Sequence, residues 1–388
     1  MDADVIVAGG GVIGTAIAWR AARDGRSVLL VDPQTDDKAS LVAAGMLGPV
    51  SESVFGEQDL LNLNLLAIGR FPSFNKELED ATGQRTGLRT EGTLAVAYDS
   101  DDLAALDRLT AFRHSIGLDA ERLDARECRR QEPFLSPATR GGVLAQGDLS
   151  VDNRRYLAAL KQAAANAGVR TMTGYVTEVS DGQVSVTTPT QTAAPPNVSP
   201  VSPVSPAPNR LSARHVVIAA GYATSAIDGV PDEVRKAIRP VKGQILRLRH
   251  PRNIPPVLTH TVRAIVQGHD VYLVPRADGE LVAGATQEER DDRDVTAGAV
   301  HDLLRDATTA VPAISELILA EASAGLRPGT SDNGPILGQV GTERLIIAAG
   351  HFRNGILLSA ATADAVAVLL AGGRPNTAWA PFQPERFR

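Results

Sequence analysis

The chain has 388 residues, of which 43% are hydrophobic and 22% are charged; these values are typical of a globular protein with a sizeable core. Its 39 Lys and Arg residues against 45 Asp and Glu residues give a formal net charge of −6, so no excess of positive charge is available for a nucleic-acid backbone. The one cysteine, Cys128, excludes an internal disulfide framework and any multi-cysteine metal site.

The two ends of the chain indicate a cytoplasmic protein without a membrane partner. The first residues carry acidic side chains where a secretory signal needs positive charge. The longest late apolar stretch, residues 356–370, contains Asp364 and is shorter than the ~20 residues that span a bilayer. We therefore expect a buried helix there.

The chain begins with a pattern typical of a parallel βαβ unit. Residues 5–8 form an apolar run, residues 13–22 have helical apolar spacing, and residues 27–31 form a second apolar run. Between the first strand and the helix lies G-x-G-x-x-G, with glycines at Gly9, Gly11 and Gly14. In that context the motif predicts a dinucleotide site, in which the helix N-terminus faces a pyrophosphate.

Asp32 ends the next predicted strand, where a carboxylate can accept hydrogen bonds from both ribose hydroxyls. On these residues alone, FAD and NAD both remain possible cofactors.

The middle of the chain is predicted to alternate helices and strands. Helical spacing covers 60–82, 101–117 and 153–167, and strand patterns cover 89–98 and 215–221. Residues 187–209 contain seven prolines and cannot form a packed core. We expect a disordered or polyproline surface loop within the cofactor domain; a linker between domains and a Pro-rich recognition motif are the alternatives.

The last third of the chain favours a flavin. Strand patterns at 243–248, 271–275 and 281–286 precede a helix at 295–311, a strand at 344–348 and a helix at 355–370. The last strand runs into a second glycine turn and a helix. Flavoproteins of the glutathione-reductase type bring such a distant C-terminal helix to the flavin ring, whose reduced form is anionic and is stabilised by a helix N-terminus.

Six segments of the chain resemble, in order and spacing, the glycine oxidases of the D-amino acid oxidase superfamily. The resemblance covers nearly the whole chain outside the Pro-rich segment, and its last two segments are the most specific. The segments are 43–48 (AAGMLG), 240–243 (PVKG), 272–276 (YLVPR), 282–286 (VAGAT), 324–330 (AGLRPGT) and 349–358 (AGHFRNGILL).

The resemblance implies an α/β protein with a Rossmann-like FAD domain of glutathione-reductase type and an α+β substrate domain whose sheet is mostly antiparallel. We expect the FAD domain to comprise 1–88, 148–240 and 326–388, and the substrate domain to comprise 89–147 and 241–325. We expect the cofactor to be non-covalent FAD, because 320–327 lacks the cysteine that binds flavin covalently in monomeric sarcosine oxidases. The resemblance also implies a small amino-acid substrate and O2 as partners, and a homo-oligomer, commonly a tetramer in the family.

The implied reaction is oxidation of glycine, sarcosine or a small D-amino acid to the imine and then glyoxylate, with reduction of O2 to H2O2. The imine would supply the thiazole of thiamine. A D-amino acid or sarcosine oxidase, an amine dehydrogenase with another acceptor, and a flavin-bearing subunit without its own activity are the alternatives.

Roles in substrate and cofactor binding can be predicted for single residues. A guanidinium is the preferred clamp for a carboxylate, and Arg327 is expected to bind that of the substrate. By resemblance, Tyr272 donates to the same carboxylate, while Met46 and Arg353 lie beside the flavin. No metal site is expected. The predicted cofactor-binding residues are Gly9, Gly11, Val12, Ile13, Gly14, Asp32, Ser40, Ala43, Ala44, Gly45, Met46, Val176, Gly221, Gly350, His351, Arg353, Asn354, Gly355 and Ile356.

The sequence departs from the family pattern near the substrate. Asp270 stands two residues before Tyr272, where glycine oxidases can carry a histidine, and Ser40-Leu41 replaces a Thr-Ser pair. The first change puts the size and charge of the substrate in question, and the second removes one hydroxyl group near the phosphates.

Overall fold

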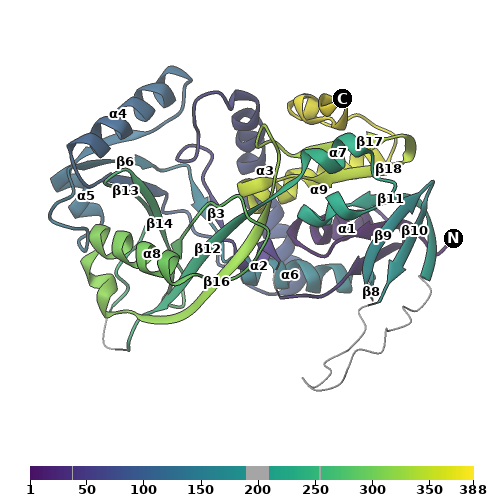
Figure 1. The fold of residues 1–388 in the computed structure, drawn as a ribbon, viewed down its shortest axis with the longest axis horizontal. Helices are drawn as coiled ribbons and strands as arrows, with labels where there is room; N and C mark the ends of the chain where they lie inside the picture. Colours follow the sequence, from purple (N-terminus) through teal and green to yellow (C-terminus); the bar gives the residue numbers. More distant parts are fainter. Residues whose placement is uncertain (37, 189–208, 253–254) are drawn as a thin grey trace.

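The structure is a computed structural model that describes residues 1–36, 38–188, 209–252 and 255–388. Nearly all of the predicted Pro-rich loop lies outside these residues. Its two ends join β10 (Gln183–Thr187) to β11 (Asn209–Ile218). Two large sheets lie side by side, and the long strands of the second sheet, β12 (Arg239–Arg249) and β16 (Ile318–Gly329), run toward the first (Figure 1).

The first sheet is the expected nucleotide-binding sheet. Its strands are joined in parallel pairs from β18 through β11, β1 and β2 to β8, and β17, β10 and β9 add antiparallel pairs. The remaining strands are β1 (Ala3–Ala8), β2 (Val28–Asp32), β8 (Arg170–Thr173), β9 (Tyr175–Ser180), β17 (Ile336–Val340) and β18 (Thr342–Ala349).

Two helices, α1 (Val12–Arg23) and α9 (Gly355–Leu370), pack on this sheet, and α3 (Gln58–Thr82) and α6 (Asn153–Asn166) pack on these helices and on each other. Every residue of β2 is buried, as expected for a central parallel strand covered on both faces. The segment Phe352–Leu370 is long and apolar enough to cross a membrane, but 78% of its apolar window is buried inside the protein. It is therefore a core helix.

The second sheet is antiparallel except for the pair β13–β4. Helix α8 (Ala297–Ala310) packs on β12 to β15, and α4 (Ser100–Ser115) packs on β4 and β6. A separate apolar core lies within this half. The other strands are β4 (Thr93–Ala97), β5 (Glu121–Asp124), β6 (Gly141–Ala145), β13 (Thr261–Val266), β14 (His269–Pro275) and β15 (Glu280–Gly284).

The remaining elements are short. They are α2 (Ala39–Val42), β3 (Met46–Leu47), α5 (Ala125–Gln131), β7 (Leu149–Ser150), α7 (Asp232–Ala237) and the 3-10 turns η1 (Gly221–Ala226), η2 (Pro312–Glu316), η3 (Phe352–Asn354), η4 (Thr377–Phe382) and η5 (Pro384–Phe387). The predicted α/β fold class is confirmed. The predicted boundaries of the domains in the sequence stay a prediction.

The single cysteine lies beside the second sheet, away from both glycine turns. Cys128 on α5 is buried, and burial raises the pKa of its thiol to about 11. The thiolate is the reactive form, so Cys128 is an unreactive core residue.

Candidate functional site

A cavity of about 640 Å³ is lined by residues from both sheets. One end of the cavity is formed by the two glycine turns of the first sheet. The other end is formed by β4, β12, β13, β14 and β16 of the second sheet and by the residues that follow β15. The cavity is long, and its two ends differ in the kind of group that they present.

The first glycine turn brings backbone groups to the cavity. Gly9 has φ +106°, and a side chain there would meet the Ala219 carbonyl. A Cβ atom at Gly14 would overlap the Gly9 carbonyl oxygen. The turn can therefore close only with glycines, and it places the N-terminus of α1 at the cavity wall.

Polar side chains complete this end. Asp32 is 4% exposed; it accepts a hydrogen bond from the Gly10 amide at 3.0 Å and lies 3.3 Å from the Lys38 ammonium group. The Ser40 hydroxyl accepts from the Val12 amide at 3.0 Å. The start of α1 and the end of β2 thus carry the donors and the carboxylate that a dinucleotide needs.

The loop that contains Ser40 and Gly45 is held by its backbone carbonyl groups. Asn153 on α6 donates to the carbonyl groups of Ser40 and Leu41 at 2.8 and 3.0 Å. Arg276 donates to the Ala44 carbonyl, and Arg247 to the Leu41 carbonyl at 3.2 Å. Both arginines also donate to the Asn153 side chain. This buried network fixes the loop without using its side chains.

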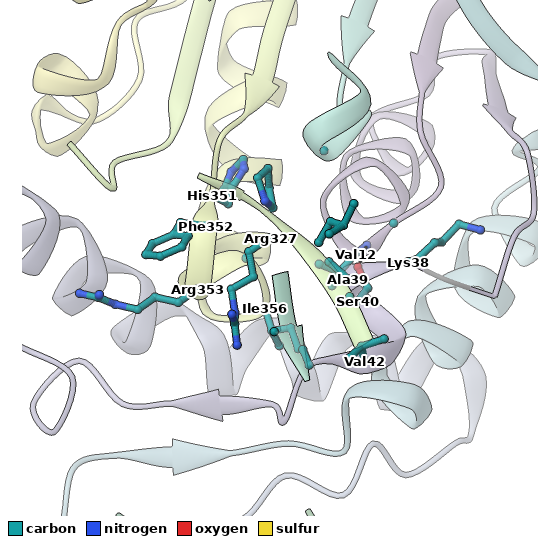
Figure 2. A pocket seen from close by; sticks show the side chains of 18 of the residues that line it. Val12, Lys38, Ala39, Ser40, Val42, Arg327, His351, Phe352, Arg353 and Ile356 are labelled. Atoms are coloured by element: carbon teal, nitrogen blue, oxygen red, sulfur yellow. Dashed lines mark hydrogen bonds between the residues drawn. The ribbon is translucent and has the colours of Figure 1, made fainter. Parts of the chain in front are cut away.

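The second glycine turn places His351 and Arg353 at the cavity. Burial lowers the pKa of His351 to about 3, and its Nε2 atom lies 3.0 Å from the Thr362 hydroxyl. The imidazole is therefore neutral. Arg353 forms an ion pair with Glu57, which also accepts from Asn333 at 2.8 Å. In Figure 2 the Arg353 side chain extends away from that of Arg327.

Arg327 and Tyr272 lie at the opposite end, each against a glycine. A Cβ atom at Gly243 would overlap the Arg327 guanidinium group, and one at Gly284 would lie 2.6 Å from the Tyr272 hydroxyl. Arg327 donates to the Thr286 carbonyl at 3.1 Å. Burial raises the pKa of Tyr272, although the positive charge of Arg327 acts to lower it. A neutral phenol and a guanidinium therefore face one pocket.

A second charged group lies next to Tyr272. Arg263 is directly opposite Tyr272 in the β13–β14 pair, and it donates to Glu52 at 2.9 Å. Arg263 and Glu52 both line the cavity. Asp270, on the same strand as Tyr272, also lines it.

The backbone around Glu52 is held by two buried groups. Asp148 accepts from the amides of Val50 and Ser51 at 3.0 and 3.1 Å, and burial raises its pKa to about 6. Arg113 donates to the Ser51 carbonyl at 2.7 Å and to the Ser53 hydroxyl at 3.2 Å. Burial, together with the charge of Arg263, lowers the pKa of Arg113 to about 10.

The structure brings most of the predicted site residues to this one cavity. The four predicted catalytic residues, Arg327, Tyr272, Arg353 and Met46, all line it. Of the predicted cofactor residues, Gly14, Gly350 and Asn354 do not line it. The others do: Gly9, Gly11, Val12, Ile13, Asp32, Ser40, Ala43, Ala44, Gly45, Met46, Val176, Gly221, His351, Arg353, Gly355 and Ile356.

Sequence reasoning did not find Glu52, Arg263 and Arg113. A signal for Glu52 was present, since it follows the AAGMLG segment by four residues. Arg263 and Arg113 carry no such signal, because only the pairing of β13 with β14 and the packing of α4 bring them to the cavity.

The residues at the first end fit FAD. Side chains at Gly9 and Gly14 would close the space at the start of α1, and the buried carboxylate of Asp32 lies where β2 ends. The cavity continues past His351 to Arg327 and Tyr272, so a flavin ring bound there would adjoin the carboxylate-binding end. Such a continuous site suits oxidation of a small amine.

Comparisons with known proteins agree with this geometry. The family model of the FAD dependent oxidoreductases (DAO) matches residues 4–369. A glycine oxidase of Geobacillus kaustophilus is 34% identical, over 99% of this chain and 97% of that protein. A crystal structure of glycine oxidase from Geobacillus kaustophilus has a TM-score of 0.84 at 32% identity and covers 98% of each chain.

A bifunctional protein ThiO/ThiG of Synechocystis is 30% identical over 99% of this chain. The alignment covers only 54% of that relative. The chain therefore spans about half the length of this relative.

Proposed function

Because the chain belongs to the family of FAD dependent oxidoreductases, we propose that it oxidises glycine. Glycine would lose a hydride from its α-carbon and a proton from its nitrogen to give the imine; water would then add to the C=N bond and ammonia would leave, giving glyoxylate. When bound, FAD accepts the two electrons and O2 takes them to form H2O2.

One observation carries this proposal. Arg327 donates to backbone carbonyl groups, whereas Arg263 and Arg353 each donate to a glutamate. The charge of Arg327 is thus available to a ligand, and the Tyr272 hydroxyl lies beside it. A guanidinium and a phenol on one side of a pocket suit a carboxylate.

These residues would act by binding and orientation. Arg327 would bind the substrate carboxylate in two parallel hydrogen bonds, and Tyr272 would donate a third. Fixing the carboxylate orients the α C–H bond, and orientation alone can supply several kcal/mol of the barrier reduction. Ile245 and Val42 add an apolar wall to the same pocket.

An anaerobic titration of the purified holoenzyme with glycine tests the proposal. We expect the visible flavin spectrum to bleach. Arg327→Ala should raise the apparent Kd for glycine roughly 30-fold or more, while the exposed Arg344→Ala, outside the cavity, should leave it unchanged. A spectrum that stays oxidised with glycine, but bleaches with sarcosine or D-alanine, would replace glycine by that amine.

We further propose that O2 is the acceptor and that the imine supplies the thiazole of thiamine. The relative named ThiO/ThiG supports a thiamine role. One H2O2 should form per glycine oxidised, and cells that lack this protein should need added thiazole for growth. A sub-stoichiometric peroxide yield would instead indicate a dehydrogenase.

We also propose a cytoplasmic homo-oligomer with the two-domain division predicted from the sequence. Light scattering coupled to gel filtration should give a mass of a multiple of 40.8 kDa. A mass of one chain would contradict the oligomer without affecting the proposed reaction.

A further inference from the structure

The substrate end of the cavity holds a second cation that is already neutralised. Arg263 lies opposite Tyr272 on the neighbouring strand, so the two side chains share one face of the sheet. Arg327 approaches the same tyrosine from the other side, across Gly243 and Gly284. Tyr272 therefore lies between two arginines, and only one of them is paired with a carboxylate in the described structure.

Glu52 neutralises Arg263 but not Arg327. Its Oε1 atom accepts from Arg263 Nη1 at 2.9 Å, and the two side chains are only 12% and 26% exposed. At this burial the pair is less screened than a surface ion pair. A second carboxylate on a bound substrate, placed next to Tyr272, would be repelled by the Glu52 carboxylate and could not bind Arg263.

The position of Glu52 is fixed by its neighbours. Asp148 holds the amide of Ser51, and Arg113 holds the Ser51 carbonyl and the Ser53 hydroxyl. Asp148 and Arg113 are 0% and 3% exposed. The backbone before Glu52 is therefore fixed, and the hydrogen bond from Arg263 holds the Glu52 carboxylate at the cavity wall.

We propose that Glu52 is a specificity-determining residue that restricts the pocket to amines with a single carboxylate. By holding Arg263, it excludes amines that carry a second carboxylate, such as N-carboxymethyl or dicarboxylic amino acids. Asp270, which lines the same end, adds a second negative charge without a contact to Arg263 in the described residues. The inference rests on the proposed binding of the substrate carboxylate by Arg327.

Two inert ethers test the proposal. Methoxyacetate and diglycolate have the same ether backbone and differ by one carboxylate, and neither has an amine to oxidise. Their Kd values are measured on the holoenzyme from the change in the visible flavin spectrum and by calorimetry. For the wild-type protein we expect methoxyacetate to bind and diglycolate to bind more weakly.

Glu52→Gln should improve the binding of diglycolate relative to methoxyacetate roughly tenfold to a hundredfold, since it removes one repulsion and frees one charge-assisted donor. The double variant Glu52→Gln/Arg263→Met should lose this gain. Asp270→Asn should give a smaller gain.

Glu321→Gln, which breaks the Arg154–Glu321 pair outside the cavity, is the matched control and should change neither Kd. If Glu52→Gln does not retain flavin, Glu52→Ala is measured in the same way.

The outcomes separate this inference from the proposed function. If the wild-type protein binds methoxyacetate and is reduced by glycine, but Glu52→Gln gains nothing for diglycolate, the role of Glu52 is wrong and the proposed function stands. A gain that survives Arg263→Met would also overturn it. If the wild-type protein binds neither ether and glycine leaves the flavin oxidised, both proposals fail.

Discussion

The two ends of the cavity recognise their ligands by different means. At the nucleotide end, backbone amides and glycines form the wall, and a Cβ atom at Gly14 would meet another backbone atom, the Gly9 carbonyl oxygen. At the substrate end, charged side chains stand beside apolar ones in the wall, and a Cβ atom at Gly243 would meet the flexible end of Arg327. One end is fixed by the path of the chain, and the other by the balance of its charges.

This difference determines which substitutions each end of the cavity can tolerate. A backbone carbonyl inside a βαβ turn cannot move without changing the turn, whereas a guanidinium can move while the sheet beneath it stays in place. The same substitution should therefore abolish the structure of one end and only misplace a side chain at the other.

The largest effect should come from Gly14→Ala. The added methyl group overlaps the Gly9 carbonyl oxygen, so the turn has to open, and we expect a loss of bound FAD together with a destabilisation of roughly 3 kcal/mol or more. The ratio of visible to near-ultraviolet absorbance measures the bound flavin. Gly69→Ala, in an open position on α3, is the control and should keep full flavin content; a flavin-replete Gly14→Ala would contradict the comparison.

The two ends should also respond to pH in opposite directions. The pKa of His351, at the flavin end, is lowered from 6.5 to about 3, so the unfolded chain takes up a proton first and stability falls as the pH drops below about 6.5. By pH 4 the free energy of unfolding has fallen by about 3 kcal/mol.

The pKa of Asp148, at the substrate end, is raised from 3.8 to about 6. Its contribution to the free energy of unfolding is therefore fully present below pH 3.8 and is lost as the pH rises to about 6. This loss is also about 3 kcal/mol.

Urea denaturation of the holoenzyme between pH 4 and 7 checks both signs. Relative to wild type, His351→Gln should become more stable as the pH falls, and Asp148→Asn should become more stable as the pH rises through 6. If either difference is flat across this range, that group does not titrate as its burial implies.

The smallest effect should come from Gly243→Ala. The methyl group displaces the Arg327 guanidinium but leaves the backbone in place, so flavin content should be retained while the Kd for glycine rises roughly tenfold to a hundredfold. Anaerobic titration measures both quantities. Gly298→Ala, with open space around it, should change neither. If Gly243→Ala lost its flavin instead, the two ends would not be independent.

The nucleotide end could be predicted from the sequence because its parts are contiguous. The strand, the three glycines and the helix follow one another within about 20 residues, and Asp32 ends the next strand. Arg327 was also predicted, because a guanidinium suits a carboxylate, and Tyr272 was predicted through the family resemblance.

The Glu52–Arg263 pair could not be predicted, since it depends on the pairing of β13 with β14 and on a loop more than 200 residues away. The segments that contain Gly243 and Gly284 were noticed, but nothing in the sequence says that these glycines make room for an arginine and a tyrosine. Strand β5 escaped prediction for a simpler reason. Of its four residues only Leu123 is buried, so no apolar pattern marks it.

The network of Asn153, Arg247 and Arg276 has a consequence for the order of assembly. The loop of residues 40–45 gains its hydrogen bonds from α6 of the nucleotide half and from β12 and the end of β14 in the substrate half. The loop gains its full set of hydrogen bonds only when both halves are folded and docked. Cofactor capture should therefore be a late event in the maturation of the chain, and a newly made protein should pass through an open, flavin-free stage in which the loop is still accessible to proteases.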